Sequence, residues 1–396
     1  MIPLADIREA ARVLDGVALR TPVQGSNLLS AVAGGPVHLK CENLQRAGSF
    51  KIRGAYLRMS RLGAEDRARG VVAASAGNHA QGVALAAQLL GIRATVFMPD
   101  GAALPKVAAT EGYGATVRFH GATVDEALEA AQEFARTTGA VLIHPFDHPD
   151  IVTGQGTVGL EILEQVPDVR TVIVPVGGGG LLAGIASALA GTGVQVIGVQ
   201  AAGAATYPAS LAAGVPQRLT RMATMADGIA IGRPGDVPFA VLHELGVPCH
   251  TVSEEDLSRA LVALAERAKL LVEPAGVAAA AALLAGLEVA TPAVVVLSGG
   301  NIDPLLLVRV LRHGLVAAGR YLHLQVRVPD APGNLARLLA VLAATGANVV
   351  HVEHDRTSPD LGVEEVDIAV QVETRGTDHC SAVLAELRSQ GFRILE

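Results

Sequence analysis

Runs of β-branched residues alternate with Ala- and Leu-rich helical patterns along most of the chain, and this alternation restricts the fold more than any other feature. Strands that alternate with helices pair in parallel and are covered by helices on both faces, so the pattern predicts an α/β fold with parallel sheets. Ligands of such sheets bind at the carboxyl ends of the strands. The predicted strands cover residues 70–74, 95–98, 116–119, 141–144, 171–175, 195–199 and 293–297, and two of the predicted helices cover 78–90 and 125–138.

The pattern changes near residues 314–320, where strands and helices begin to follow one another in a different order. Residues 321–328 alternate as a strand, and a helix follows that begins near Pro332 and ends before Gly346. Two extended segments, a second helix and a short strand complete a βαββαβ unit, which is the ferredoxin-like arrangement. We therefore predict a first domain over 1–315, whose smaller subdomain spans about 48–150, and a second domain over 320–396. The remaining elements are expected at 347–355, 366–372, 378–390 and 392–395.

Composition excludes several classes of partner. The chain of 396 residues has a formal net charge of −7, and no basic patch is interleaved with aromatic residues, so we expect neither nucleic acid nor a membrane as a partner. Its three cysteines, Cys41, Cys249 and Cys380, are widely spaced and odd in number, which argues for reduced thiols and a cytoplasmic location. The uncharged segment 172–190 is as long as a membrane span, but Pro175 and four glycines inside it favour a strand, a turn and a helix.

One lysine, Lys51, lies in the string GSFKIRGA at 48–55 and is the first candidate catalytic residue. Most lysines are solvated surface charges, and that is the default interpretation of this one. A lysine whose amine is buried loses its charge readily and then attacks carbonyl groups as a nucleophile. Three glycine-containing segments that follow predicted strands decide between these interpretations.

The first of these segments is SAGNHAQG at 75–82, between a predicted strand and a predicted helix. Free backbone N–H groups at a helix start, together with the Ser75 hydroxyl and the Asn78 amide, suit an anion such as a substrate carboxylate. The alternative is an ordinary helix cap.

The other two segments are GGGGL at 177–181 and LSGGN at 297–301. The glycines of GGGGL let the backbone approach a phosphate closely, although a flexible turn has the same composition. In LSGGN a hydroxyl can face a ring nitrogen while the glycines leave room for a planar ligand, and the alternative is an ordinary turn. Taken together, Lys51 and the three segments predict one pocket for a phosphorylated aldehyde, held as a Schiff base beside a carboxylate substrate. This is the chemistry of pyridoxal 5'-phosphate.

The strings GSFKIRGA, SAGNHAQG, PVGGGGL and LSGGN, in this order, resemble the motifs of the serine/threonine dehydratases. These are fold type II pyridoxal phosphate enzymes, which are similar to tryptophan synthase β. The resemblance covers the chain from its start to about His313, and residues 330–356 resemble part of an ACT regulatory domain. The resemblance thus implies two open α/β subdomains with parallel sheets, followed by a ferredoxin-like ACT domain.

The resemblance also implies the roles of individual residues. Lys51 forms the Schiff base with the cofactor, Phe50 stacks near its ring, Asn78 bonds the ring hydroxyl, and Ser298 faces the pyridine nitrogen. The phosphate lies in a backbone cradle made by Gly177, Gly178, Gly179, Gly180 and Leu181. The substrate carboxylate is held by Ser75, Gly77, Asn78 and His79.

The reaction that the resemblance implies is deamination of L-threonine to 2-oxobutanoate and ammonia by β-elimination of water, with L-serine giving pyruvate. In this reaction the Lys51 amine removes the Cα proton. One alternative is a serine racemase or serine dehydratase, in which Ser75 supplies a second acid/base, and another is a 3-hydroxyaspartate dehydratase. A third alternative, from a different class, is a non-catalytic amino-acid sensor.

Regulation, assembly and metal binding are the remaining expectations. ACT domains pair edge to edge and bind amino acids, so Gly333, Asn334 and Leu335 are candidate effector residues, and we expect a homodimer or homotetramer. Some relatives hold a divalent cation beside acidic residues, but the matching segment at 199–210 has no Asp or Glu, so we predict no metal site. The string TMADGIAI at 224–231 matches the family, and we interpret its Asp227 as structural.

Overall fold

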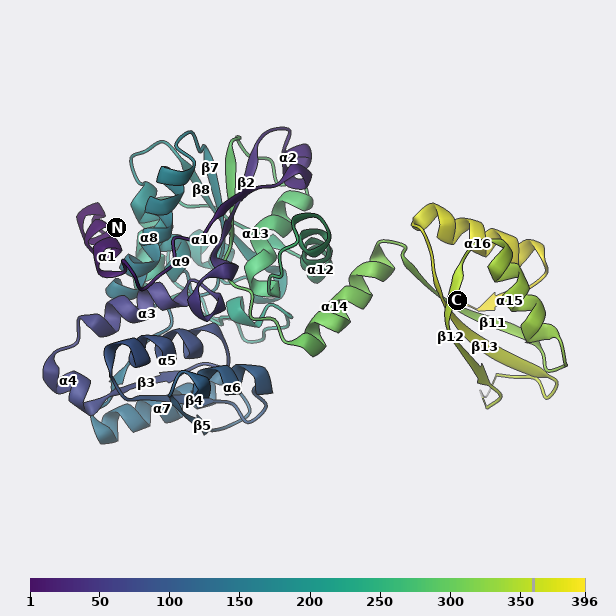
Figure 1. The fold of residues 1–396 in the computed structure, drawn as a ribbon, viewed down its shortest axis with the longest axis horizontal. Coiled ribbons are helices and arrows are strands. Elements are labelled where there is room, and N and C mark those ends of the chain that lie inside the picture. Colours follow the sequence, from purple (N-terminus) through teal and green to yellow (C-terminus); the bar gives the residue numbers. More distant parts are fainter. Residues whose placement is uncertain (358–359, 396) are drawn as a thin grey trace. The chain divides into compact units, whose positions relative to one another are not determined.

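The computed structural model describes residues 1–357 and 360–395. It divides into two compact units, Met1–Leu306 and Leu307–Glu396 (Figure 1). The first unit contains one mainly parallel and one fully parallel sheet, and the second contains one antiparallel sheet. Each unit is built around its own hydrophobic core.

A six-stranded sheet forms the larger part of the first unit, in the order β1-β2-β10-β7-β8-β9. All neighbouring strands are parallel except β1 and β2. Every residue of β7 and β10 is buried, as expected for β-branched strands covered by helices on both faces. The strands are β1 (Val23–Gly25), β2 (Val37–Cys41), β7 (Thr171–Pro175), β8 (Gln195–Ala201), β9 (Cys249–Val252) and β10 (Ala293–Leu297).

Helices and short helical turns surround this sheet. The helices are α1 (Leu4–Val13), α2 (Asn27–Ala33), α8 (Pro149–Gln165), α9 (Gly180–Leu189), α10 (Tyr207–Ala213), α11 (Asp236–Glu244), α12 (Glu254–Ala263) and α13 (Pro274–Leu284). The short turns are η1 (Glu42–Leu44), η2 (Arg46–Gly48), η3 (Ala202–Ala204), η4 (Asp227–Ile229) and η5 (Leu264–Ala268).

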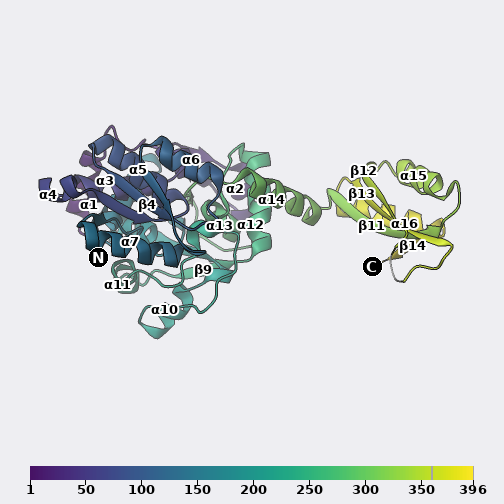
Figure 2. The same ribbon diagram turned by 90° about the horizontal axis from the view of Figure 1, so that it is seen from below.

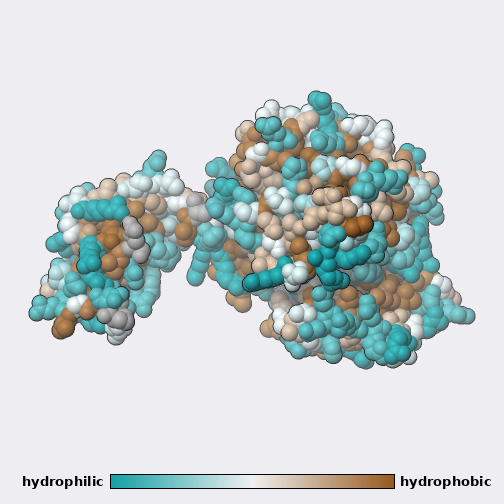
Figure 3. Space-filling model, turned by 180° about the vertical axis from the view of Figure 1, so that it is seen from behind, coloured by the Kyte–Doolittle hydropathy of each residue, from teal (hydrophilic) through white to brown (hydrophobic). Residues whose placement is uncertain are grey.

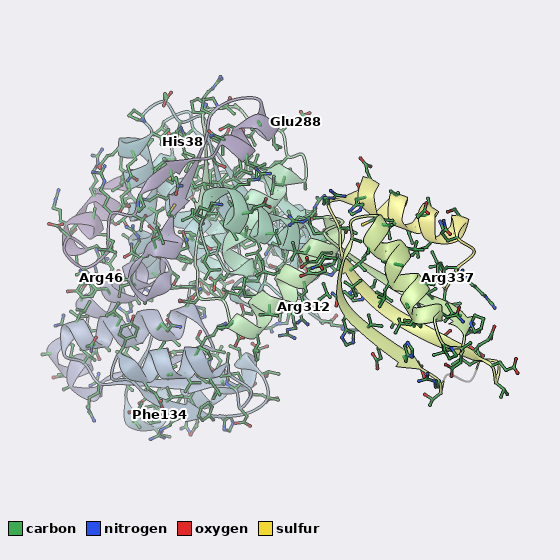
Figure 4. The ribbon with its side chains drawn as sticks, turned by 45° about the vertical axis from the view of Figure 1, so that its right-hand side comes forward. His38, Arg46, Phe134, Glu288, Arg312 and Arg337 are labelled. Atoms are coloured by element: carbon green, nitrogen blue, oxygen red, sulfur yellow. The ribbon has the colours of Figure 1, made fainter. Side chains whose placement is uncertain are left out.

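A four-stranded parallel sheet forms the smaller part, in the order β5-β4-β3-β6. Alternate residues of β3 face opposite sides: Val71 joins the core beneath α5, and Val72 joins the core beneath α7. The side chain of Phe134, labelled in Figure 4, lies on α7 and packs against Phe97 of the sheet. The elements are β3 (Val71–Ala74), β4 (Ala94–Met98), β5 (Thr116–Phe119), β6 (Val141–Leu142), α3 (Lys51–Ser60), α4 (Ala64–Arg69), α5 (Asn78–Leu90), α6 (Leu104–Gly112) and α7 (Val124–Thr138).

Helix α8 touches both α3 and α9 through its backbone. A Cβ atom on Gly154 of α8 would lie 2.7 Å from the Cα of Gly54 on α3. On the α9 side, a Cβ atom on Gly184 would lie 2.4 Å from the carbonyl oxygen of Val152 on α8. Real Cβ atoms do not approach other atoms this closely, so only glycine fits at these positions.

The second unit is the antiparallel sheet β12-β13-β11-β14 with two helices. Leu338 of α15 and Leu387 of α16 share one core with Val326 and Ile368 of the sheet. Both helices therefore pack on the same face of the sheet (Figures 1 and 2). Arg337 of α15, labelled in Figure 4, stacks on the ring of Phe392. The elements are β11 (Tyr321–Pro329), α15 (Asn334–Ala344), β12 (Asn348–Asp355), β13 (Glu365–Glu373), α16 (Thr377–Ser389) and β14 (Arg393–Leu395), preceded by α14 (Pro304–Ala317).

The predicted parallel α/β fold and the predicted βαββαβ unit are both confirmed. One predicted strand, 141–144, is shorter than expected and ends at Leu142. It ends there because the chain turns: Nδ1 of His144 accepts the backbone N–H groups of Phe146 and Asp147. Polar side chains alternate with small apolar areas on the face of the molecule in Figure 3, as on ordinary protein surfaces.

The uncharged segment 172–190 forms most of β7, a glycine turn and α9. This is the strand, turn and helix that the sequence favoured. Within residues 1–357 and 360–395, no helix combines the length and the apolar character that crossing a bilayer requires.

Candidate active site

Lys51 is the first residue of α3, and its side chain is partly buried. Its Nζ donates a hydrogen bond to the carbonyl oxygen of Pro145 at 3.0 Å and lies 5.0 Å from the centre of the Phe50 ring. Burial lowers the pKa of Lys51 to about 8, although the nearby carboxyl of Glu273 opposes the shift. With this pKa, about a tenth of the amine is neutral at pH 7, against about 0.03% for an ordinary lysine. The amine is therefore prepared for nucleophilic attack and for proton transfer.

The glycine loop lies between β7 and α9, and its backbone N–H groups are free. Among the described residues, no protein acceptor takes the N–H groups of Gly177, Gly178, Gly179 or Gly180. They lead into the N-terminus of α9, where the helix dipole adds a positive partial charge. Leu181 is only 4% exposed and packs into the core, so only its backbone faces the loop.

Close neighbours explain why this loop consists of glycines. A Cβ atom on Gly178 would lie 2.3 Å from the ring of Phe146. Gly179 has a φ of +100°, and a Cβ atom there would lie 1.8 Å from the hydroxyl oxygen of Tyr207. Phe146 follows Pro145, whose carbonyl holds Lys51, so this short segment connects the lysine amine with the glycine loop.

The SAGNHAQG loop connects β3 with α5 and begins at Ser75. The hydroxyl of Ser75 accepts the backbone N–H of Gly77 at 3.1 Å. His79 is buried, its Nε2 lies 2.7 Å from the carbonyl oxygen of Ile143, and burial lowers its pKa to about 3. Its imidazole is therefore neutral and engaged with the backbone. A Cβ atom on Gly77 would lie 3.8 Å from Nζ of Lys106, so the ammonium group of Lys106 lies beside this loop.

The LSGGN loop follows β10 and meets the lysine segment directly. The carbonyl oxygen of Ser298 accepts the backbone N–H of Phe50 at 3.3 Å, and Gly299 forms a β-bridge with Ser49. A Cβ atom on Gly299 would lie 3.0 Å from Nδ2 of Asn78. The structure thus brings the lysine and the three predicted loops to one place at the carboxyl ends of β3, β7 and β10.

The sequence pointed to no role for Glu273, Lys106 or Asn301 in this site and to only a structural role for Asp227. Glu273 is buried beside Asn78, and burial together with the charge of Asp227 raises its pKa to about 7. Lys106 and Asp227 form an ion pair, with Nζ and Oδ2 at 2.6 Å, that joins α6 to η4. Asn301 donates from Nδ2 to Oδ1 of Asn78 at 2.8 Å. Only tertiary contacts distinguish these side chains from ordinary surface or turn residues.

The candidate effector residues lie in a separate pocket of the second unit. Gly333, Asn334 and Leu335 line a hollow of about 310 Å³ at the turn between β11 and α15. Its floor is apolar, and its rim carries an ion pair between Asp330 and Arg356. Within residues 1–357 and 360–395, no three His, Cys, Asp or Glu side chains are grouped so that they could hold a metal ion.

Comparison with known proteins identifies the family. Residues 14–299 match the family described as pyridoxal-phosphate dependent enzyme, and the chain belongs to that family. It is 45% identical to the L-threonine ammonia-lyase of Thermotoga maritima over 100% of this chain and 99% of the relative. Among solved structures, a threonine deaminase from Solanum lycopersicum superposes with a TM-score of 0.75 at 37% identity, covering 79% of this chain and 87% of that one. Maize serine racemase superposes with a TM-score of 0.74 at 35% identity, covering 80% and 98% of the two chains.

The cofactor of this enzyme is pyridoxal 5'-phosphate, and the residues present fit it. The free N–H groups of the glycine loop match a phosphate, and the glycines leave the close approach that a side chain would block. The amine of Lys51, with its lowered pKa, matches an aldehyde. The predicted fold type II architecture is confirmed by the family match and by the superposition on threonine deaminase.

Proposed function

We propose that this enzyme deaminates L-threonine to 2-oxobutanoate and ammonia and accepts L-serine as a second substrate. The amine of Lys51 carries the assignment of the reaction class. Burial lowers its pKa to about 8, and it lies where three predicted ligand-binding loops meet. The choice of threonine is supported by relatives named L-threonine ammonia-lyase that match the chain over its full length.

Each residue of the site has a defined task in this reaction. Bound pyridoxal phosphate supplies the electron sink for the charge that develops at Cα. Lys51 would hold the cofactor through its amine and would take the Cα proton on Nζ. Its pKa of about 8 suits this task, because a base is most effective when its pKa is near the working pH. Ser298 would hold the ring nitrogen through its hydroxyl, which, unlike a carboxylate, would not keep that nitrogen protonated.

The two other loops bind the charged ends of cofactor and substrate. Gly177, Gly178, Gly179, Gly180 and Leu181 hold the phosphate through backbone N–H groups. Ser75 and the N–H groups of the following residues hold the substrate carboxylate, beside the ion pair of Lys106 and Asp227. The β-hydroxyl leaves with a proton as water, and hydrolysis of the released enamine gives 2-oxobutanoate and ammonia, so one water is lost and one is consumed.

A serine racemase is the second candidate, because the chain superposes on maize serine racemase and Ser75 offers a hydroxyl at the substrate loop. One panel separates the candidates: keto-acid and D-serine formation from L-threonine, L-serine and threo-3-hydroxyaspartate. We expect the highest kcat/KM for L-threonine. Faster formation of D-serine than of keto acid would favour the racemase, and a preference for threo-3-hydroxyaspartate would favour the third dehydratase.

We also propose that residues 320–396 form an ACT domain that binds an amino acid in the pocket lined by Gly333, Asn334 and Leu335. The apolar floor of this pocket suits a branched side chain, and its charged rim suits the ammonium and carboxylate groups of isoleucine or valine. Steady-state kinetics with and without these amino acids test the proposal. Identical curves, together with no binding in equilibrium dialysis, would leave the domain without an effector.

Assembly and location complete the proposal. A homodimer or homotetramer is expected, and light scattering of the purified enzyme measures it. A cytoplasmic location agrees with free thiols at Cys41, Cys249 and Cys380. Fractionation of the source cells tests that location.

A further inference from the structure

The amide of Asn78 has two ends of nearly equal shape and opposite hydrogen-bonding character. In the function proposed above, Asn78 donates an N–H to the ring hydroxyl oxygen of the cofactor, so its nitrogen end must face the ligand. An asparagine nitrogen donates two hydrogen bonds, and its oxygen only accepts them. Something in the protein has to keep the amide from rotating by half a turn.

Asn301 determines one end of this amide. Its Nδ2 donates to the backbone carbonyl of Ala47 at 2.7 Å and to Oδ1 of Asn78 at 2.8 Å. A backbone carbonyl can only accept, so it is the nitrogen of Asn301 that faces Ala47 and Asn78. The atom of Asn78 that faces this nitrogen must then be its oxygen. A weaker contact to Oε1 of Gln81 at 3.3 Å, also with an acceptor, agrees with this orientation.

The turn before Lys51 holds Asn301 in place. Ala47 has a φ of +57° and Gly48 a φ of +68°. A Cβ atom on Gly48 would lie 2.2 Å from Oδ1 of Asn301, so a glycine is required there for the asparagine to fit. The same turn thus leads into Lys51 and packs against Asn301.

Glu273 determines the other end of the Asn78 amide. Its Oε1 accepts a hydrogen bond from Nδ2 of Asn78, and the glutamate is only 3% exposed. An ionised carboxylate can only accept. One hydrogen of the Asn78 nitrogen is therefore used by Glu273, and the second stays free for a ligand. Glu273 is the N-cap residue of α13, but its side chain makes no capping hydrogen bond, so its carboxyl remains available for this contact.

We propose that Asn301 and Glu273 are positioning residues that lock the Asn78 amide with its nitrogen toward the ring hydroxyl of pyridoxal phosphate. The inference rests on the cofactor role proposed for Asn78. All hydrogen bonds run in one direction, from Asn301 to Asn78 and from Asn78 to Glu273. Turning the central amide would place its oxygen against a carboxylate and its nitrogen against another N–H group, so both contacts would become repulsive.

The test is the substitution Asn301→Asp, which keeps the shape of the side chain and replaces its donor with an acceptor. The new carboxylate and Glu273 then compete for the N–H groups of Asn78, so we expect the amide to lose its single orientation toward the ligand. Titration of the apoenzyme at about pH 8.5, where Glu273 with a pKa of about 7 is ionised, measures Kd for two probes. We expect Kd for pyridoxal phosphate to rise by at least about tenfold, which is the scale of one lost charge-assisted hydrogen bond. Kd for 3-deoxypyridoxal phosphate, which lacks the ring hydroxyl, is expected to change by less than about twofold.

The matched control is Asn43→Asp. Asn43 is also a buried asparagine whose Nδ2 donates to a backbone carbonyl, that of Leu271 at 3.0 Å, but it has no contact with Asn78. Asn43→Asp makes the same chemical change as Asn301→Asp. We expect its Kd for pyridoxal phosphate and its Kd for 3-deoxypyridoxal phosphate to stay within about twofold of the wild-type values. A shifted absorbance maximum of the bound cofactor in Asn301→Asp alone is a second signature that a general loss of stability does not produce.

Asn301→Ala keeps the comparison available if the aspartate variant does not fold. The alanine removes the hydrogen bond that orients Asn78 but does not attract the N–H groups of Asn78. The selective rise in Kd for pyridoxal phosphate should therefore be smaller than that of Asn301→Asp. Equal weakening of both probes, or no weakening of either, overturns the inference. Turnover of L-threonine by the wild type is measured separately. A failure of the proposed function is therefore distinguishable from a failure of the inference about Asn301 and Glu273.

Discussion

Replacing Arg53 with methionine is expected to destabilise the first unit strongly, because Arg53 connects two carboxylates in the interior. Its guanidinium donates to both oxygens of Glu42, at 2.9 and 2.8 Å, and to both oxygens of Glu161, at 2.6 and 3.0 Å. The side chains of Arg53 and Glu42 are 1% and 0% exposed. Burial alone would raise the pKa of Glu42, but the charges of Arg53 and Lys40 and the hydrogen bonds from Arg53 and Thr21 together lower it.

The magnitude follows from what the substitution leaves behind. Methionine fills most of the space of the arginine stem, so the loss is chiefly electrostatic. Glu42 would remain buried with a hydrogen bond from Thr21 and the more distant charge of Lys40. Leaving a buried charge without its partner costs about 3–5 kcal/mol. The deficit should shrink as the pH falls, because Glu42 without Arg53 has a raised pKa and escapes the cost by taking up a proton.

Urea unfolding of the apoenzyme, followed by circular dichroism, measures the change in the free energy of unfolding. The control is Arg20→Met, which removes an arginine from an exposed pair with Glu164, where the side chains are 57% and 65% exposed. That pair should contribute less than about 1 kcal/mol. Equal losses for the two variants, or a deficit for Arg53→Met that grows as the pH falls, would refute the electrostatic reasoning.

Two further predictions concern the cofactor site. The rate at which pyridoxal phosphate attaches covalently to the apoenzyme should rise with pH and level off near the Lys51 pKa of about 8, because only the neutral amine attacks; in stopped-flow absorbance, a rise that continues beyond about pH 10 would indicate an unperturbed lysine. Gly179→Ala should weaken cofactor binding by at least about tenfold, since its Cβ would meet the Tyr207 hydroxyl. The control is Gly191→Ala, because Gly191 also has a positive φ but no atom lies within 4 Å of a Cβ atom placed there. This variant should be less stable, while the Kd of the apoenzyme for pyridoxal phosphate should stay unchanged.

Much of the fold could be predicted because local pattern and tertiary environment agree. The strands β7 and β10 are short β-branched runs, and the structure buries every one of their residues between helices. The motifs SAGNHAQG, GGGGL and LSGGN could be placed at strand ends because each follows such a run. The predicted strand 141–144 was too long because the turn that ends it depends on hydrogen bonds to the His144 side chain. A histidine is polar in a strand and in a turn alike, so its presence in the sequence does not indicate the turn.

The polar residues behind the site could not be predicted in the same way. Glu273 precedes Pro274, and an acidic residue at a helix start has an ordinary explanation in the helix dipole. Its partner Asn78 is 195 residues away, and Asn301 lies 223 residues from Asn78. No local periodicity records such pairings, so these roles depend on how the loops of the two sheets meet.

The glycine contacts of α8 have a consequence for how this site can change. Lys51 begins α3 and the phosphate loop leads into α9, and both helices rest on α8 through backbone atoms at Gly54, Gly154 and Gly184. Pyridoxal phosphate is a rigid ligand whose aldehyde and phosphate are a constant length apart. The protein holds the matching anchors at a constant separation, and ordinary substitutions in the apolar core cannot lengthen or shorten it. New substrate preferences are therefore expected to arise in the loop at 75–79, while the cofactor anchors stay where the helices place them.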